Sequence, residues 1–97
     1  MQEELRPLLS QVAALGRKYG AKRLMLFGSR ARADFKERSD IDIAVWGMPE
    51  PYRSMFWAEL EELPTLLKFD VCHISPNTDR PFLENILKDG ELLYEES

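Results

Sequence analysis

Apolar side chains recur at helical spacing in three stretches of the chain. The first stretch runs from about residue 3 to residue 19, and its apolar positions share one face, with the spacing i, i+3, i+4, i+7 and i+10: Leu5, Leu8, Leu9, Val12 and Leu15. Residues 52–63 and 80–89 show the same kind of pattern, and each has a proline at its start, where a missing N–H costs no hydrogen bond. These patterns predict three amphipathic helices.

Short apolar runs alternate with these helices and predict strands. The run Leu24–Phe27 is continuously apolar, as expected of a strand that is covered on both faces. The strands are expected over residues 22–27, 41–46 and 68–74, with a short edge strand over 91–94 and a short helix over 30–33. The order α-β-α-β-α-β-α-β predicts a single α/β (α+β) domain, residues 1–97, in which helices pack against a sheet.

Composition and charge exclude several classes of protein. The chain is 44% hydrophobic and 31% charged, with a net charge of −4 that speaks against general nucleic-acid binding. No basic stub precedes an apolar block at the N-terminus, and no apolar run could span a membrane, so a cytoplasmic location is expected. Cys72 and His73 are the single cysteine and the single histidine, and they cannot form a zinc site alone.

The charge is distributed unevenly along the chain. Between Arg17 and Arg38 there are eight basic and two acidic residues, whereas the remainder has five basic and fifteen acidic residues. A positive segment of this kind suits a ligand that carries phosphates. On charge alone, a solvated basic face is the better interpretation.

Two aspartates stand at the start of the second predicted strand. Asp40 and Asp42 are one residue apart, so their carboxylates share one face of the strand, about 7 Å apart, while Ile41 and Ile43 point into the core. Two carboxylates in this position repel each other unless a cation lies between them. Mg²⁺ prefers such hard oxygen ligands and shares its other positions with phosphates and water. An Asp-x-Asp motif alone is nevertheless a weak signal.

A third aspartate, Asp70, lies in the third predicted strand between Phe69 and Val71. A carboxylate at such a position is costly to bury without a partner. If this strand neighbours the second, Asp70 can join Asp40 and Asp42 on one face. Three aspartates can hold two Mg²⁺ ions about 4 Å apart, which is the arrangement used in phosphoryl and nucleotidyl transfer.

The turn after the first strand offers a place for phosphates. Gly28 lets the backbone approach a ligand closely, and the Ser29 hydroxyl, the backbone N–H groups and the start of the following helix can bind phosphate oxygens. Arg30 and Arg32 could contact phosphates or form ion pairs with acidic residues nearby.

The combined pattern resembles a known family. Phe27-Gly28-Ser29-Arg30-Ala31-Arg32, followed by Ser39-Asp40-Ile41-Asp42-Ile43, is similar to the motif of the minimal nucleotidyltransferases (MNT proteins) of the DNA polymerase β superfamily. Asp70 stands where that family has its third carboxylate, and the resemblance extends from about Leu24 to Tyr94. Ala33 departs from the motif, because many members have glycine there.

The resemblance implies a nucleotidyltransferase fold with a mixed sheet of about four strands, and Mg²⁺-dependent transfer of AMP from ATP to a hydroxyl. By this resemblance, Asp40, Asp42 and Asp70 would be the catalytic and metal-binding residues. Gly28 and Ser29 would bind the triphosphate, and Arg30 and Arg32 would be candidates for further phosphate contacts.

The resemblance also implies a partner. MNT proteins are commonly paired with a helical HEPN protein, and in several pairs the MNT protein is an antitoxin that adenylylates the HEPN toxin, so a tyrosine of such a partner is the expected acceptor. The alternative is a binding module that neutralises a HEPN partner by complex formation without catalysis. A short edge strand could also be covered by self-association.

A group of large side chains near the second helix leaves a further question open. These side chains could form a partner interface or, by the simpler interpretation that we favour, pack in the core: Trp46, Met48, Tyr52, Met55 and Trp57.

Overall fold

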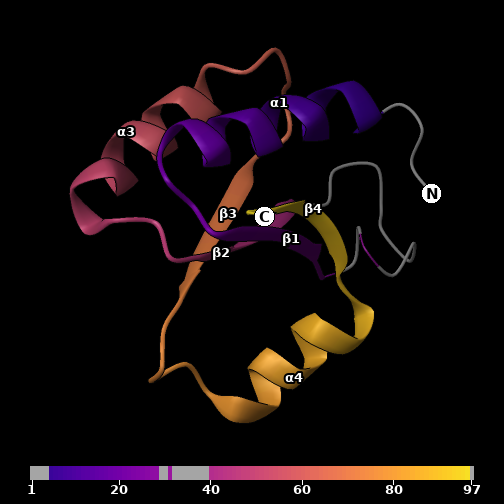
Figure 1. Cartoon of the computed structure of the whole chain (residues 1–97). Coiled ribbons are helices and arrows are strands. Elements are labelled where there is room, and N and C mark those ends of the chain that lie inside the picture. The colour runs from indigo at the N-terminus through magenta and orange to yellow at the C-terminus, as the bar shows by residue number, and fades with distance from the viewer. Residues whose placement is uncertain (1–4, 29–30, 32–39, 97) are drawn as a thin grey trace.

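The computed structural model describes residues 5–28, 31 and 40–96, and these form three helices and one four-stranded mixed sheet (Figure 1). In chain order the elements are α1 (Arg6–Lys18), β1 (Arg23–Phe27), β2 (Ile41–Trp46), α3 (Glu50–Glu61), β3 (Phe69–Ile74), α4 (Arg80–Asp89) and β4 (Glu91–Glu95). The predicted elements are therefore present, with ends that shift by at most three residues. Of the short helix expected over 30–33, only Ala31 belongs to the described residues, and it is helical.

The order of the strands in the sheet is β3-β2-β1-β4. β1 pairs antiparallel with both β2 and β4, whereas β2 pairs parallel with β3. The parallel pair requires a crossover, and α3 supplies it. The last strand lies at an edge of the sheet, as expected.

Helices cover both faces of the sheet (Figure 1). On one face, α1 and α3 enclose the larger part of the core, whose members are all buried: Leu8, Leu9, Val12, Leu24, Leu26, Ile41, Ile43, Val45, Phe56 and Leu60. On the other face, α4 places Ile86 against Met25, Ala44 and Ile74. None of the helices in the described ranges is both long and apolar enough to cross a membrane.

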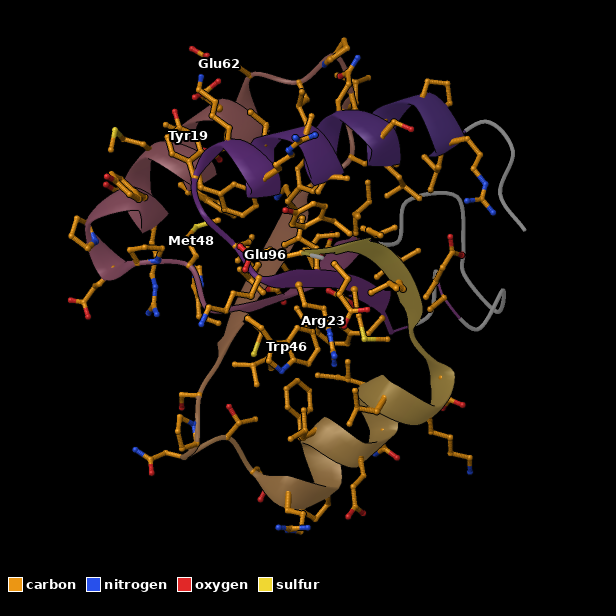
Figure 2. All side chains as sticks on the ribbon, in the orientation of Figure 1. Tyr19, Arg23, Trp46, Met48, Glu62 and Glu96 are labelled. Atoms are coloured by element: carbon orange, nitrogen blue, oxygen red, sulfur yellow. The ribbon has the colours of Figure 1, made fainter. Side chains whose placement is uncertain are left out.

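The large side chains around β2 and α3 differ in how deeply they are buried. Met48 is buried at 2% exposure and Trp46 is half-buried, with the Arg23 guanidinium 5.3 Å from the centre of its ring (Figure 2). For Tyr52, Met55 and Trp57 the core interpretation is wrong, because they remain 45%, 45% and 39% exposed on α3. Only one stripe of α3 faces the sheet, and Phe56 and Leu60 occupy it.

A polar cluster joins α1 to α3. The Tyr19 hydroxyl, labelled in Figure 2, donates a hydrogen bond to Glu59, and the Lys18 ammonium lies 3.0 Å from the same carboxylate. These hydrogen bonds, from Tyr19 first and then Lys18, lower the pKa of Glu59 below its ordinary value of 4.5.

This lowered pKa predicts a pH-dependent contribution to stability. Because the folded state holds the ionised carboxylate, the contribution is present above about pH 4.5 and is lost as the pH falls through the lower folded-state pKa. Glu59→Gln should therefore lower the Tm at pH 7, and the gap to the wild type should narrow below pH 4.5. Thermal unfolding across this pH range measures the gap, and Glu62→Gln, an exposed neighbour, serves as the control. An equal gap at every pH would contradict the prediction.

Candidate functional site

The candidate site begins where β1 ends. Gly28 follows Phe27 with a φ of +76°, a conformation that favours glycine. A Cβ at this position would collide with the Asp42 carboxylate on the neighbouring strand. The Ala31 N–H donates to the Gly28 carbonyl over 3.1 Å, which turns the chain back directly after the strand. Gly28 therefore brings the backbone of this turn against the side chain of Asp42.

The sheet register places two of the predicted aspartates side by side. Asp42 of β2 is the register partner of Asp70 on the parallel strand β3, and of Phe27 on the antiparallel strand β1. Adjacent strands lie about 4.8 Å apart, and paired residues point to the same face. Phe27, Asp42 and Asp70 thus form one row across three strands. The condition under which Asp70 could join the motif, that β3 neighbours β2, is met.

Asp40 lies next to this row, two residues before Asp42 and directly before the start of β2. It precedes Ile41, the first residue of the strand, and its side chain is exposed. Ile41 and Ile43 are both fully buried on the α1 and α3 side of the sheet, as predicted. The alternation of strand side chains therefore directs Asp40 and Asp42 towards the opposite face, which also carries α4.

Two other titratable side chains of β3, Cys72 and His73, lie on opposite faces of the sheet. Cys72 lies on the same face as Asp70, and its pKa is raised by burial and then by the negative charge of Asp70. His73 lies on the other face, where burial and then the Arg53 guanidinium lower its pKa. His73 is thus a residue of β3, as expected, and stands apart from the aspartates.

Part of the predicted site cannot be placed. Ser29, Arg30 and Arg32 lie outside the described residues, as does Ala33. Within the ranges that the structure describes, no three or more acidic, histidine or cysteine side chains gather closely enough to hold a metal ion. The sheet brings Asp42 and Asp70 side by side. Asp40 lies two residues before Asp42, and Gly28 lies against the Asp42 side chain.

Two cavities border these residues, and the sequence analysis predicts neither of them. One, of about 440 Å³, lies between the end of β1 and α4, and its described lining is Phe27, Gly28, Phe82, Asn85, Ile86 and Asp89. The other, of about 500 Å³, lies beside Asp40 and is lined by Asp40, Leu66, Leu67 and Lys68. Leu66 is fully exposed at its rim. The sequence signal that could have pointed to the first cavity is the i, i+3, i+7 spacing of Phe82, Asn85 and Asp89 on one face of α4.

Comparisons with known proteins give the fold a family context. A family model described as polymerase beta, nucleotidyltransferase, matches residues 11–97. No curated protein matches the sequence. A chain from a toxin–antitoxin complex crystallised with AMP-PNP superposes with a TM-score of 0.73 at 19% identity, covering 92% of this chain and 74% of the other.

Two further solved structures share the fold. A protein assigned as a minimal nucleotidyltransferase gives a TM-score of 0.71 at 28% identity, over 91% of both chains. A chain from the complex of a tri-AMPylated Shewanella oneidensis HEPN toxin with an MNT antitoxin gives 0.65 at 19% identity, over 93% of this chain and 72% of the other. The expected nucleotidyltransferase fold and the resemblance to MNT proteins are confirmed. Since the family model spans nearly all of the sequence, the chain belongs to the polymerase beta nucleotidyltransferase family.

Proposed function

We propose that this protein is a Mg²⁺-dependent nucleotidyltransferase that transfers AMP from ATP to a hydroxyl group, namely a tyrosine of a HEPN partner protein. The observation that carries the proposal is the register pair Asp42 and Asp70 beside Gly28, in a chain of this family. Two of the similar structures support its finer points: one complex contains an ATP analogue, and another contains an AMPylated HEPN toxin.

The donor set fits Mg²⁺. Asp40, Asp42 and Asp70 offer hard carboxylate oxygens on one face of two neighbouring strands, and the missing side chain of Gly28 makes room for the Asp42 carboxylate itself. Asp40 and Asp70 are exposed, so rotation of their side chains can bring the three carboxylates to common ions. We assign the binding of two Mg²⁺ ions to these residues. When bound, the ions neutralise phosphate charge and align the attacking and leaving oxygens.

The chain's own residues divide the remaining work. Gly28 and Ser29 hold the triphosphate, and Arg30 and Arg32 are candidates for additional phosphate contacts. The acceptor oxygen forms a bond to the α-phosphorus of ATP, the bond to the β-phosphate oxygen breaks, and pyrophosphate leaves. Asp70 assists by drawing the proton from the acceptor hydroxyl.

The cavity beside Asp40 suits the acceptor. It lies next to Asp40 along the start of β3, and the fully exposed Leu66 at its rim offers an apolar contact to an incoming protein segment. Of the three aspartates, Asp40 lines this cavity, so a tyrosine side chain entering there would meet the site at Asp40.

A binding module without catalysis is the second candidate. The observation in its favour is the exposure of Tyr52 and Met55, which lie three residues apart on one side of α3, since large apolar side chains in water are typical of interfaces. Such a surface would serve occlusion of a partner as well as recognition of a substrate. Catalysis therefore has to be tested directly.

The two candidates differ in what they leave on the partner. The protein is expressed together with a HEPN protein, and the intact mass of the HEPN protein is measured. We expect the mass to increase by one or more AMP groups, and tandem mass spectrometry should place them on tyrosine. An inhibited partner of unchanged mass would favour the binding module instead.

A further inference from the structure

The cavity between β1 and α4 has the size and position of a ligand site. Its volume of about 440 Å³ lies within the range of roughly 300–1,000 Å³ that is typical of small-molecule pockets. It reaches Gly28, which packs against the Asp42 carboxylate, so it opens directly onto the proposed reaction centre. In Figure 1, α4 lies beneath the end of the sheet at which β1 finishes.

One stripe of α4 forms the floor of this cavity. Phe82, Asn85, Ile86 and Asp89 follow the spacing i, i+3, i+4 and i+7, which places them on one side of the helix along about 10 Å of its axis. Ile86 is buried at 1% exposure and fixes the helix to the sheet. The Phe82 ring meets the Phe27 ring edge to face, with 5.6 Å between centroids, and remains 37% exposed.

These side chains match the chemistry of a nucleobase. The exposed part of Phe82 offers a flat apolar surface on which a base can stack. The Asn85 amide has both a donor and an acceptor, the combination that pairs with the amino group and a ring nitrogen of adenine. The Asp89 carboxylate repels phosphate, so a bound nucleotide would direct its phosphates away from Asp89 and towards Gly28.

We propose that this cavity binds the purine base of the donor nucleotide, with Phe82 stacking on the base and Asn85 reading its amino group. The proposal rests on the proposed function, because it supplies the base-recognition part of the same donor site. It implies that α4 takes part in selecting the nucleotide.

Binding of nucleotides to the isolated, full-length protein in the presence of Mg²⁺ tests the proposal. Isothermal titration calorimetry compares ATP, UTP and inorganic tripolyphosphate. ATP should bind at least about tenfold more tightly than tripolyphosphate, and more tightly than UTP, because a purine stacks over a larger area. Phe82→Ala should weaken ATP binding about tenfold and leave the affinity for tripolyphosphate unchanged.

A second variant isolates the polar contact without touching the core. The wild type should prefer ATP over purine riboside triphosphate, which lacks the amino group, and Asn85→Ala should lose this preference. Leu87→Ala is the matched control, since Leu87 lies on the same helix, is 48% exposed and does not line the cavity. Circular dichroism confirms that each variant is folded.

The outcomes separate this proposal from the proposed function. Equal affinities for ATP and tripolyphosphate, an unchanged ATP affinity in folded Phe82→Ala, or no ATP binding at all would overturn the base pocket. If AMP transfer to the partner occurs while these variants are neutral, only the base pocket fails. If base-dependent binding is found but the partner is never modified, the pocket stands and the transfer reaction fails.

Discussion

Replacing both Asp40 and Asp42 with asparagine is expected to abolish AMP transfer and leave the protein folded. Asparagine keeps the size of aspartate but loses the negative charge that Mg²⁺ requires. Metal ions contribute several kcal/mol to the stabilisation of such transition states, so the rate should fall by at least about a thousandfold. Transfer of radioactive AMP to the partner measures the loss.

Two controls make this result specific. Asp79→Asn changes an exposed aspartate that caps α4 by accepting a hydrogen bond from the Phe82 N–H, and asparagine caps a helix equally well. This variant should transfer AMP at the wild-type rate. ATP binding to the wild type should also disappear when a chelator removes Mg²⁺. Continued labelling of the partner by the double variant would refute the assignment of the metal ligands.

The sequence predicts the part of the site that depends on local strand patterns, but not the part that depends on the order of the strands in the sheet. The apolar run Leu24–Phe27 and the alternation around Asp40 and Asp42 define β1 and β2 by local patterns, and the structure agrees with both. The position of Asp70 could be stated only conditionally, because the order of strands in a sheet depends on tertiary packing. Its adjacency to Asp42 follows from the parallel pairing of β2 with β3.

Burial of individual apolar residues was harder to predict from the sequence. Phe82 is an apolar residue of the helix predicted over residues 80–89, yet 37% of it is exposed at the cavity beside Phe27. On α3, Tyr52 lies about one helical turn before the buried Phe56 but remains 45% exposed, because the helix meets the sheet over only part of its length. Helical periodicity gives the direction of a side chain, whereas the extent of the neighbouring surface decides whether that side chain is covered.

Gly28→Ala is expected to remove most of the transfer activity, although it adds a single methyl group. Alanine at a φ of +76° is strained by roughly 1–2 kcal/mol, and its Cβ would collide with the Asp42 carboxylate. The new methyl group would push Asp42 away from Gly28 and out of its place beside Asp70, and a displacement of about 1 Å at a reaction centre can cost a hundredfold in rate. We therefore expect at least about a hundredfold loss, measured with radioactive ATP and the partner.

Gly47→Ala separates displacement of Asp42 from backbone strain. Gly47 has nearly the same φ, +75°, but its added Cβ would meet the side chain of the exposed Lys22, with atoms that can move into solvent. Both alanine variants should therefore lower the Tm by a similar amount, about 4–8 °C for each kcal/mol of strain in a domain of this size. Only Gly28→Ala should lose transfer, because only there does the new methyl group displace a carboxylate that binds Mg²⁺. If both variants lose transfer equally, the loss reflects stability alone, and the close approach of Gly28 to Asp42 has no catalytic role.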